Sequence, residues 1–213
     1  MKVGVLGSGV VAQVLGSGFL KHGHDVMVGS RTPDKLADWA EKNPTGSTGT
    51  FAAAAAFGEL IVLAVKGGAA LDVLRLARAQ NLVGKPVVDA TNPIADEPPV
   101  DGVLQFFTGH DESLMEQLQR EFPTTSFVKA FNSVGNALMI DPHFPGGKPT
   151  MFICGNDAEA KQTVTGILDQ FGWETADMGT AAAARAIEPL CMLWCIPGFL
   201  RNEWTHAFKL LKM

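Results

Sequence analysis

The hydrophobic positions at the start of the chain form two short apolar runs with a helix-like stretch between them. The first run contains Val3, Val5 and Leu6 and is bounded by glycines, and the second covers residues 26–28. The intervening stretch extends from Val10 to about His22. Short apolar runs next to glycine predict buried strands, so this region predicts a strand, a tight turn, a helix and a second strand.

The same alternation continues along the first half of the chain. Helices are expected at about 33–42, with Thr32 as N-cap, and at 67–78, while "ELIVLAVK" and "KPVVDATNP" have the character of buried parallel strands. A short strand near residue 48 and an alanine-rich helix lie between them. Uninterrupted alternation of strands and helices predicts an α/β fold with a Rossmann-like, doubly wound and mostly parallel sheet.

The second half begins with a proline-, glycine- and acid-rich segment at 94–112, which predicts a long loop at the carboxyl edge of the sheet. A helix, the strand "SFVKAF", a further strand-helix-strand unit and a mainly helical tail, broken at Pro197-Gly198, are expected after it. No linker separates these elements. We therefore expect residues 1–140 to form a Rossmann domain and residues 141–213 a small α/β extension, ending in helices, on the same core.

The turn after the first predicted strand carries a dinucleotide fingerprint. It is composed of Gly7, Ser8, Gly9, Val10, Val11 and Ala12, the G-x-G-x-x-A variant. Gly7 allows the sharp turn, Gly9 lets a pyrophosphate approach the backbone, and Ala12 lets the helix pack closely on the sheet. The amides of Gly9, Val10 and Val11 are expected to point at the phosphates from the positive end of the helix. A merely structural glycine turn is the alternative.

The end of the second strand is where the adenosine ribose of a bound dinucleotide lies in this fold. Enzymes that use NAD place an acidic residue there, but no acid occurs between Val28 and Pro33. Ser30 can donate a hydrogen bond, Arg31 can hold a phosphate with two hydrogen bonds, and Lys35 follows one helical turn later. These groups suit the 2′-phosphate of NADP. A solvated basic turn is the alternative.

Composition and charge exclude several other classes. The formal net charge of -5 leaves no basic stripe for nucleic acid, and the absence of tyrosine excludes the Tyr-Lys pair of short-chain dehydrogenases. The cysteines, at 154, 191 and 195, have no metal-site spacing, so no metal site is expected. No signal peptide is visible, and charges and prolines interrupt the apolar stretch 181–200, so we expect a cytoplasmic protein without a membrane span.

Several segments together resemble the F420-dependent NADP oxidoreductase family, which includes the cytosolic domain of six-transmembrane metalloreductases. They are "GVLGSGVVAQVLG", "VGSRTPDK", "VVDATNPI", "VKAFNSVGNAL", "ICGNDAEAK" and "ARAIEPLCMLW", and they follow the family's order over nearly the whole chain. The glycine turn is common to many families. The serine-arginine pair, the D-A-T-N-P exit and the K-A-F-N segment are more specific.

The resemblance implies an NADP-dependent oxidoreductase that transfers hydride between NADP(H) and a small redox acceptor, either the deazaflavin F420 or a flavin. It places the cofactor on Gly7, Ser8, Gly9, Val10, Val11, Ser30, Arg31, Thr32, Lys35, Ala64, Val65, Asn92, Pro93 and Asn132. It implies no catalytic acid or base, because hydride transfer between two planar rings needs alignment above all.

Two other functions remain open. A small hydroxyacid-type dehydrogenase would use Lys129 and Asn132, although an ordinary strand-end cation is the favoured interpretation of Lys129. An NADP-binding redox sensor would bind the cofactor without turnover. In the apolar tail, Glu188 is expected to pair with Arg185, three residues earlier, and the C-terminal helices are a candidate homodimer contact.

Overall fold

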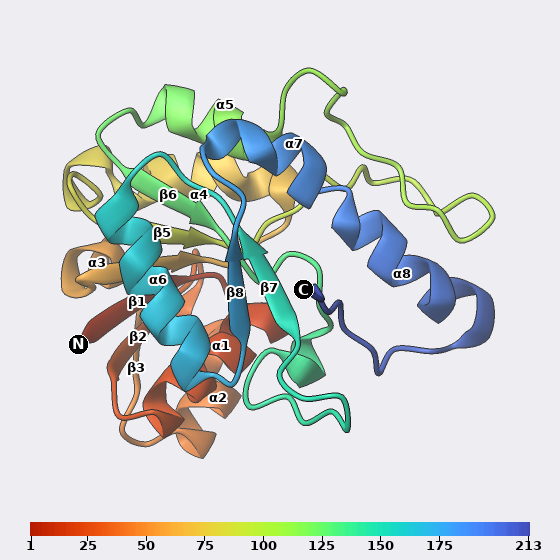
Figure 1. The fold of residues 1–213 in the computed structure, drawn as a ribbon. Coiled ribbons are helices and arrows are strands. Elements are labelled where there is room, and N and C mark those ends of the chain that lie inside the picture. The colour runs from red at the N-terminus through yellow and green to blue at the C-terminus, as the bar shows by residue number, and fades with distance from the viewer.

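Six parallel strands form the central sheet of the computed structural model, which describes residues 1–213 (Figure 1). Their order is β3-β2-β1-β4-β5-β6. The strands are β1 (Lys2–Leu6), β2 (Asp25–Gly29), β3 (Ser47–Gly49), β4 (Leu60–Leu63), β5 (Pro86–Asp89) and β6 (Ser126–Lys129). The order reverses between β1 and β4, so the predicted doubly wound Rossmann-like fold is confirmed.

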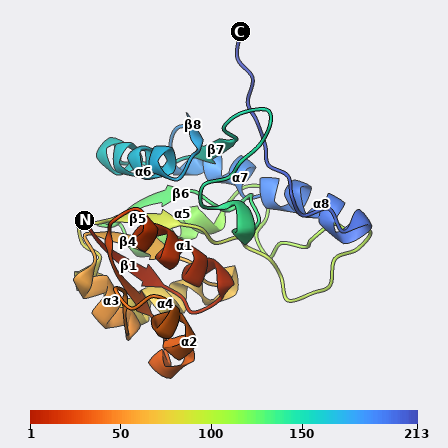
Figure 2. The same ribbon diagram turned by 90° about the horizontal axis from the view of Figure 1, so that it is seen from below.

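Helices cover both faces of this sheet (Figure 2). One face packs on α1 (Val10–Lys21), α6 (Ala158–Gln170) and Trp39 of α2 (Ala37–Lys42). The other face packs on α3 (Phe51–Phe57), α4 (Ala70–Ala77) and α5 (Leu114–Glu121). Since side chains alternate along a strand, Val88 contacts the first cluster and Val87 the second.

Local capping explains where several helices begin. Thr50, Ser113 and Asp157 accept hydrogen bonds from backbone N–H groups of α3, α5 and α6. Thr32 occupies the expected N-cap position, but its side chain makes no such bond, and the helix begins as a short 3-10 turn. The 3-10 turns are η1 (Pro33–Leu36), η2 (Gly67–Ala69), η3 (Ala79–Asn81), η4 (Asn136–Leu138) and η5 (Ala181–Ala183).

A second, two-stranded sheet lies beside the first. It pairs β7 (Thr150–Ile153) with β8 (Glu174–Asp177) in parallel, with α6 as the connection. An isolated bridge between Lys129 and Cys154 links it to the end of β6. Met151 and Val164 lie in the same buried cluster as Val5, so the C-terminal residues pack on the core of the first sheet.

The C-terminal segment differs from the expected broken helical tail. Two helices, α7 (Ala184–Ile187) and α8 (Leu190–Arg201), are followed by residues without regular structure, and α8 passes through Pro197-Gly198 without a break. Figure 1 shows α8 extending away from the sheet and the last residues returning towards β7. On this return, Thr150 donates its N–H to the carbonyl oxygen of Phe208 over 2.8 Å.

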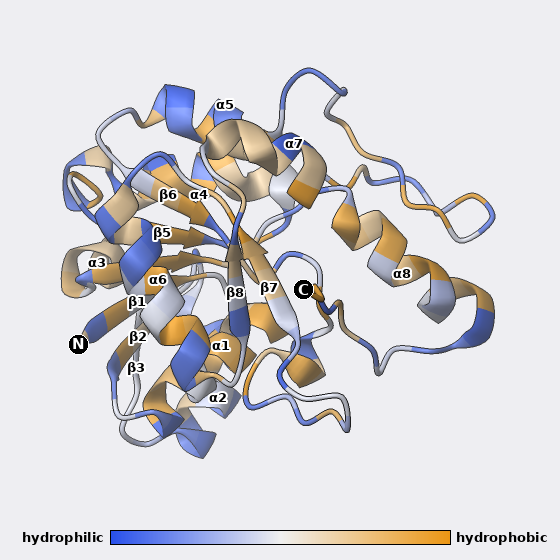
Figure 3. Ribbon diagram, viewed as in Figure 1, coloured by the Kyte–Doolittle hydropathy of each residue, from blue (hydrophilic) through white to orange (hydrophobic).

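The helical run Ala181–Arg201 is long and apolar (Figure 3). Its length and composition would suffice to cross a membrane, although Ile187 and Glu188 lie in the protein interior. Its outer part exposes Leu193, Phe199 and Leu200. The expected absence of a membrane span therefore stays a prediction.

Candidate cofactor site

The glycine turn connects β1 to α1 at the carboxyl edge of the sheet. Gly7 has a φ of +150° and donates its N–H to the carbonyl oxygen of Gly29 over 3.0 Å. A Cβ atom at Gly7 would lie 2.2 Å from the carbonyl oxygen of Ala64. Both the backbone angle and the contact with β4 therefore require glycine at this position.

Gly9 has a different role, because nothing in the protein lies within 4 Å of the place where its Cβ would be. It precedes α1, whose first turn has no acidic residue and no side-chain cap. The first N–H groups of a helix have no intrahelical acceptor. At α1 they belong to residues that line a cavity, so the open space beside Gly9 suits a phosphate.

The end of β2 carries a feature that we call the cationic rim, composed of Ser30, Arg31 and Lys35. Ser30 is buried, and its Oγ accepts the N–H of Thr32 over 3.1 Å, which leaves the hydroxyl proton free to donate. Arg31 and Lys35 are exposed and have no ion-pair or hydrogen-bond partner through their side chains. Two unpaired cations beside a buried hydroxyl form a ready site for a phosphate.

A cavity of about 540 Å³ joins these features. Its lining includes most of the residues implied by the resemblance: Gly7, Ser8, Gly9, Val10, Val11, Ser30, Arg31, Thr32, Lys35, Ala64 and Val65. It also includes Phe51, Lys66, Ala69, Asp72, Val73, Leu76 and Ala90, which sequence reasoning did not assign. The helical spacing of Asp72, Val73 and Leu76 on α4, and of Ala69 directly before it, is the signal that could have placed them on one face.

The donor set of this cavity fits NADP. The open backbone at Gly9 and the helix N-terminus suit the pyrophosphate, and the cationic rim suits a further phosphate on the ribose. Asp72 is the sole carboxylate in the lining, and Arg75 pairs with it over 3.3 Å.

Asn92, Pro93 and Asn132 lie outside the cavity lining. Asn92 donates to the backbone oxygen of Asn132 over 2.7 Å, and Asn132 donates to Oδ1 of Asn92 over 3.2 Å and to the carbonyl oxygen of Ile187 over 2.9 Å. The exits of β5 and β6 are thus tied to each other and to α7. A direct contact of these three residues with the cofactor stays a prediction.

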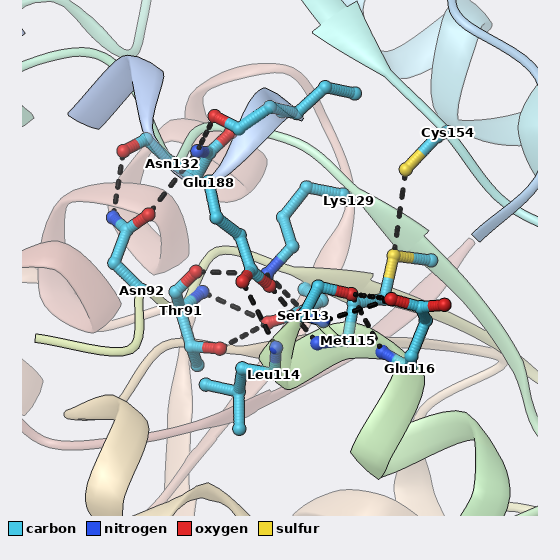
Figure 4. Close-up of polar contacts among 12 residues, drawn as sticks. Thr91, Asn92, Ser113, Leu114, Met115, Glu116, Lys129, Asn132, Cys154 and Glu188 are labelled. Carbon is cyan, nitrogen blue, oxygen red and sulfur yellow. Dashed lines mark hydrogen bonds and ion pairs between the residues drawn. The ribbon is translucent and has the colours of Figure 1, made fainter. Parts of the chain in front are cut away.

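Next to this amide pair lies a feature that we call the buried charge cluster: Asp89, Lys129 and Glu188. Figure 4 labels Lys129 and Glu188. Nζ of Lys129 lies 2.6 Å from Oδ2 of Asp89, 2.9 Å from Oε1 of Glu188 and 3.0 Å from the carbonyl oxygen of Thr91. The side chains of Asp89 and Lys129 have no exposed surface. Neighbouring register positions on β5 and β6 bring them to the same face of the sheet.

This geometry overturns two expectations about charged residues. Lys129 is no ordinary strand-end cation, because it is completely buried, and Glu188 pairs with Lys129 instead of Arg185. A separation of three residues in the sequence does not identify the partner when a distant strand supplies a buried counter-charge. Arg185 turns outward and binds Glu116 on α5 over 2.7 Å.

Lys129 is unsuited to proton transfer. Burial lowers the pKa of Lys129, but the opposing effect of Asp89 and Glu188 is larger, and the pKa lies above its ordinary value. Nζ of Lys129 donates to the carbonyl oxygen of Thr91 and forms ion pairs with both carboxylates. A buried ammonium held between two carboxylates gives no support to a hydroxyacid-type dehydrogenase with Lys129 as acid or base.

The carboxylate of Glu188 also caps α5. Its oxygens accept the N–H groups of Leu114 and Met115, each over 3.0 Å (Figure 4). These are the first amides of a helix whose N-cap, Ser113, forms a capping box with Glu116. Hydrogen bonds from Arg185 to Glu116 hold the pKa of that carboxyl at about 2.

Comparison with known proteins identifies the family of this chain. Residues 2–93 match the family model described as NADP oxidoreductase, coenzyme F420-dependent. A solved structure from Arthrobacter sp. FB24, assigned as an F420-dependent NADP-reductase, is 32% identical, with a TM-score of 0.93 and 100% of both chains covered. The chain belongs to the F420-dependent NADP oxidoreductase family. It is therefore a member of a family of NADP-dependent oxidoreductases.

Two further relatives are similar to this chain. The F420-dependent NADP reductase of Methanocaldococcus jannaschii is 27% identical over 209 residues, which are 91% of this chain and 90% of that protein. Metalloreductase STEAP3 of Rattus norvegicus is 36% identical over 205 residues. The chain spans 39% of the length of STEAP3, so the resemblance to it is confined to a part of that protein.

Proposed function

We propose that the protein transfers hydride between NADP(H) and a deazaflavin (F420) or flavin-type acceptor. The observation that carries the cofactor preference is the cationic rim: Arg31 and Lys35 lie unpaired at a cavity that begins at a helix N-terminus. The F420-dependent reductase of M. jannaschii and the Arthrobacter structure support the choice of acceptor.

In this proposal, the residues of this chain bind NADP(H) and orient its nicotinamide ring. The N-terminus of α1 would hold the pyrophosphate, Ser30, Arg31 and Lys35 the 2′-phosphate, and the apolar face of α4 the adenine. The nicotinamide half would then lie towards the exits of β4, β5 and β6, near Asn92 and Asn132, because the sheet order runs away from β2 in that direction. When bound, NADPH supplies the hydride itself.

The substitution Arg31→Glu tests the placement of the 2′-phosphate. Loss of a charged contact and the added repulsion should weaken NADPH binding by about 2–4 kcal/mol, whereas NADH binding should change little. Isothermal titration calorimetry with both cofactors measures this. Lys42→Glu is the matched control, because Lys42 is exposed and outside the cavity and its substitution changes the net charge equally.

Equal losses for NADPH and NADH in Arg31→Glu would contradict the proposed phosphate site. Steady-state NADPH oxidation with F420, FMN, FAD or ferric chelates tests the acceptor. Tight NADPH binding without turnover on any of them would favour a redox sensor over an enzyme.

We also propose that the protein is cytoplasmic and forms a homodimer through its C-terminal helices, with a small-molecule acceptor and neither nucleic acid nor a membrane as partner. The exposed apolar side chains of Leu193, Phe199 and Leu200 on α8 support the dimer. Sedimentation velocity of the purified chain measures the oligomeric state.

A further inference from the structure

The end of α7 is attached to the residues at the end of β6 through two adjacent residues, Ile187 and Glu188. Asn132, beyond β6, donates to the carbonyl oxygen of Ile187, and the next residue, Glu188, binds Lys129 at the end of β6 (Figure 4). Both attachments are buried. The position of α7 and the positions of the strand exits therefore depend on each other.

Lys129 extends this attachment to the neighbouring strand exit. It binds the carbonyl oxygen of Thr91, whose own N–H and hydroxyl both donate to Oδ1 of Asp89, over 3.0 Å and 2.6 Å. The backbone immediately before Asn92 is thereby held through every polar group of Thr91. These contacts fix the direction of the backbone at Asn92 and Pro93, which follow Thr91.

The segment between Lys129 and Asn132 carries backbone strain. Phe131 is buried and has a φ of +61°, a left-handed conformation that is strained for a bulky residue. A strained backbone conformation persists when contacts on both sides of the residue hold the chain in place. Here the anchors on the two sides of Phe131 are Lys129, in the buried charge cluster, and Asn132, in the amide pair.

Asn132 also has a buried oxygen, Oδ1, without a hydrogen-bond partner. Its Nδ2 atom is already engaged with Asn92 and Ile187, so this amide cannot turn without breaking those contacts. The orientation of the amide pair is thus set by α7 and by the strand exits together.

We propose that Glu188 is a positioning residue for the nicotinamide half of the site: through Lys129 and Thr91 it sets the strand exits that carry Asn92 and Asn132. This proposal rests on the proposed function. Glu188 does not touch the reacting atoms, and its effect is transmitted by the ammonium of Lys129 and by the docking of α7.

Glu188→Gln tests the proposal with a side chain of the same size. The amide of Gln has one acceptor oxygen where Glu188 has two, so it cannot keep all of the contacts to Lys129, Leu114 and Met115. Lys129 keeps the counter-charge of Asp89. Arg185→Gln is the matched control. It removes the partly exposed ion pair between α7 and α5 and leaves the contacts of Glu188 in place.

Three readouts separate positioning from general destabilisation. They are the affinity for 2′,5′-ADP, which has no nicotinamide; the fluorescence lifetime of bound NADPH, which reports how firmly the nicotinamide is held; and the hydride-transfer rate with NADPH deuterated at the transferred position. In Glu188→Gln we expect unchanged 2′,5′-ADP affinity, a shorter NADPH lifetime, and a rate about 10- to 100-fold lower with a larger isotope effect, as for a misaligned donor. Arg185→Gln should leave all of them unchanged.

Equal lifetimes and rates in Glu188→Gln and Arg185→Gln would overturn the proposal, and so would a parallel loss of 2′,5′-ADP affinity in Glu188→Gln. The lifetime needs no acceptor, so absence of turnover in the unsubstituted protein would contradict the proposed function and leave this test intact.

Discussion

The two halves of the candidate site, which we propose for the adenosine and the nicotinamide of NADP, place their charged side chains in opposite environments. At the adenosine half, Arg31 and Lys35 are exposed and have no partner in the protein. At the nicotinamide half, Lys129 is completely buried and contacts two carboxylates and a carbonyl. Water stabilises an unpaired surface cation at little cost, but a charge in the interior must be compensated by other groups of the protein. The first arrangement keeps charge available for a ligand, and the second uses it to hold elements together.

The two halves also differ in how far apart their residues lie in the sequence. Ser30, Arg31 and Lys35 lie within one short segment after β2, whereas the buried charge cluster combines residues from β5, β6 and the junction of α7 with α8. Substitutions at the two halves should therefore affect different quantities. The cationic rim should control binding, and the buried charge cluster should control stability and alignment.

The largest contrast is expected between two substitutions of lysine by methionine. Lys129→Met leaves Asp89 and Glu188 buried without a counter-charge and should lower the free energy of unfolding by about 3–5 kcal/mol. Lys35→Met, on the exposed rim, should change it by less than about 0.5 kcal/mol. Urea denaturation at neutral pH measures both. If the additional substitutions Asp89→Asn and Glu188→Gln restored none of the stability lost in Lys129→Met, uncompensated charge would not be the cause.

A smaller contrast distinguishes the two glycines of the turn. Gly7→Ala should lower the free energy of unfolding by about 2–3 kcal/mol, because of its φ of +150° and the 2.2 Å contact with Ala64. Gly9→Ala should leave stability nearly unchanged, since its Cβ meets no protein atom, and should weaken NADPH binding. Thermal denaturation and NADPH titration of both variants test this. A Gly9→Ala protein that binds NADPH normally would place the pyrophosphate elsewhere.

The smallest effect is expected at an ion pair of intermediate exposure, Glu116 with Arg185. The pKa of Glu116 is about 2 in the folded protein, below its usual 4.5, so its stabilising contribution is complete above pH 4.5 and disappears as the pH falls to about 2. Because Arg185 is about half exposed, solvent screening reduces this contribution to about 1 kcal/mol. The difference in unfolding free energy between the unsubstituted protein and Glu116→Gln should shrink over that pH range. A difference independent of pH would contradict this assignment.

The adenosine half could be predicted closely from the sequence. The glycine turn, the absence of an acid after β2 and the placement of Arg31 and Lys35 all follow from local patterns, and the cavity lining contains these residues. The face of α4 that completes the cavity was missed, although its helical spacing is visible in the sequence. An amphipathic spacing indicates that a face packs against something, but not which part of that face meets a cavity.

The charged residues of the second half show where sequence reasoning fails. Arg185 lies three residues before Glu188, yet Glu188 pairs with Lys129, which lies on β6 and is distant in the sequence. Pro197-Gly198 predicts a helix break, yet α8 continues to Arg201. For Glu188, a buried tertiary contact outweighs a local preference. At Gly198, Trp204 lies within 2.3 Å of where a Cβ atom would be.

The sequence by itself determined the order of strands and helices, the glycine turn and the cationic end of β2, because each depends on residues close together in the chain. Only the tertiary structure decided that Asp89, Lys129 and Glu188 meet in the interior and that α7 is fastened to the strand exits. Three charges distant in sequence can be buried only when the fold brings all of them together, since each alone would be too costly to remove from water.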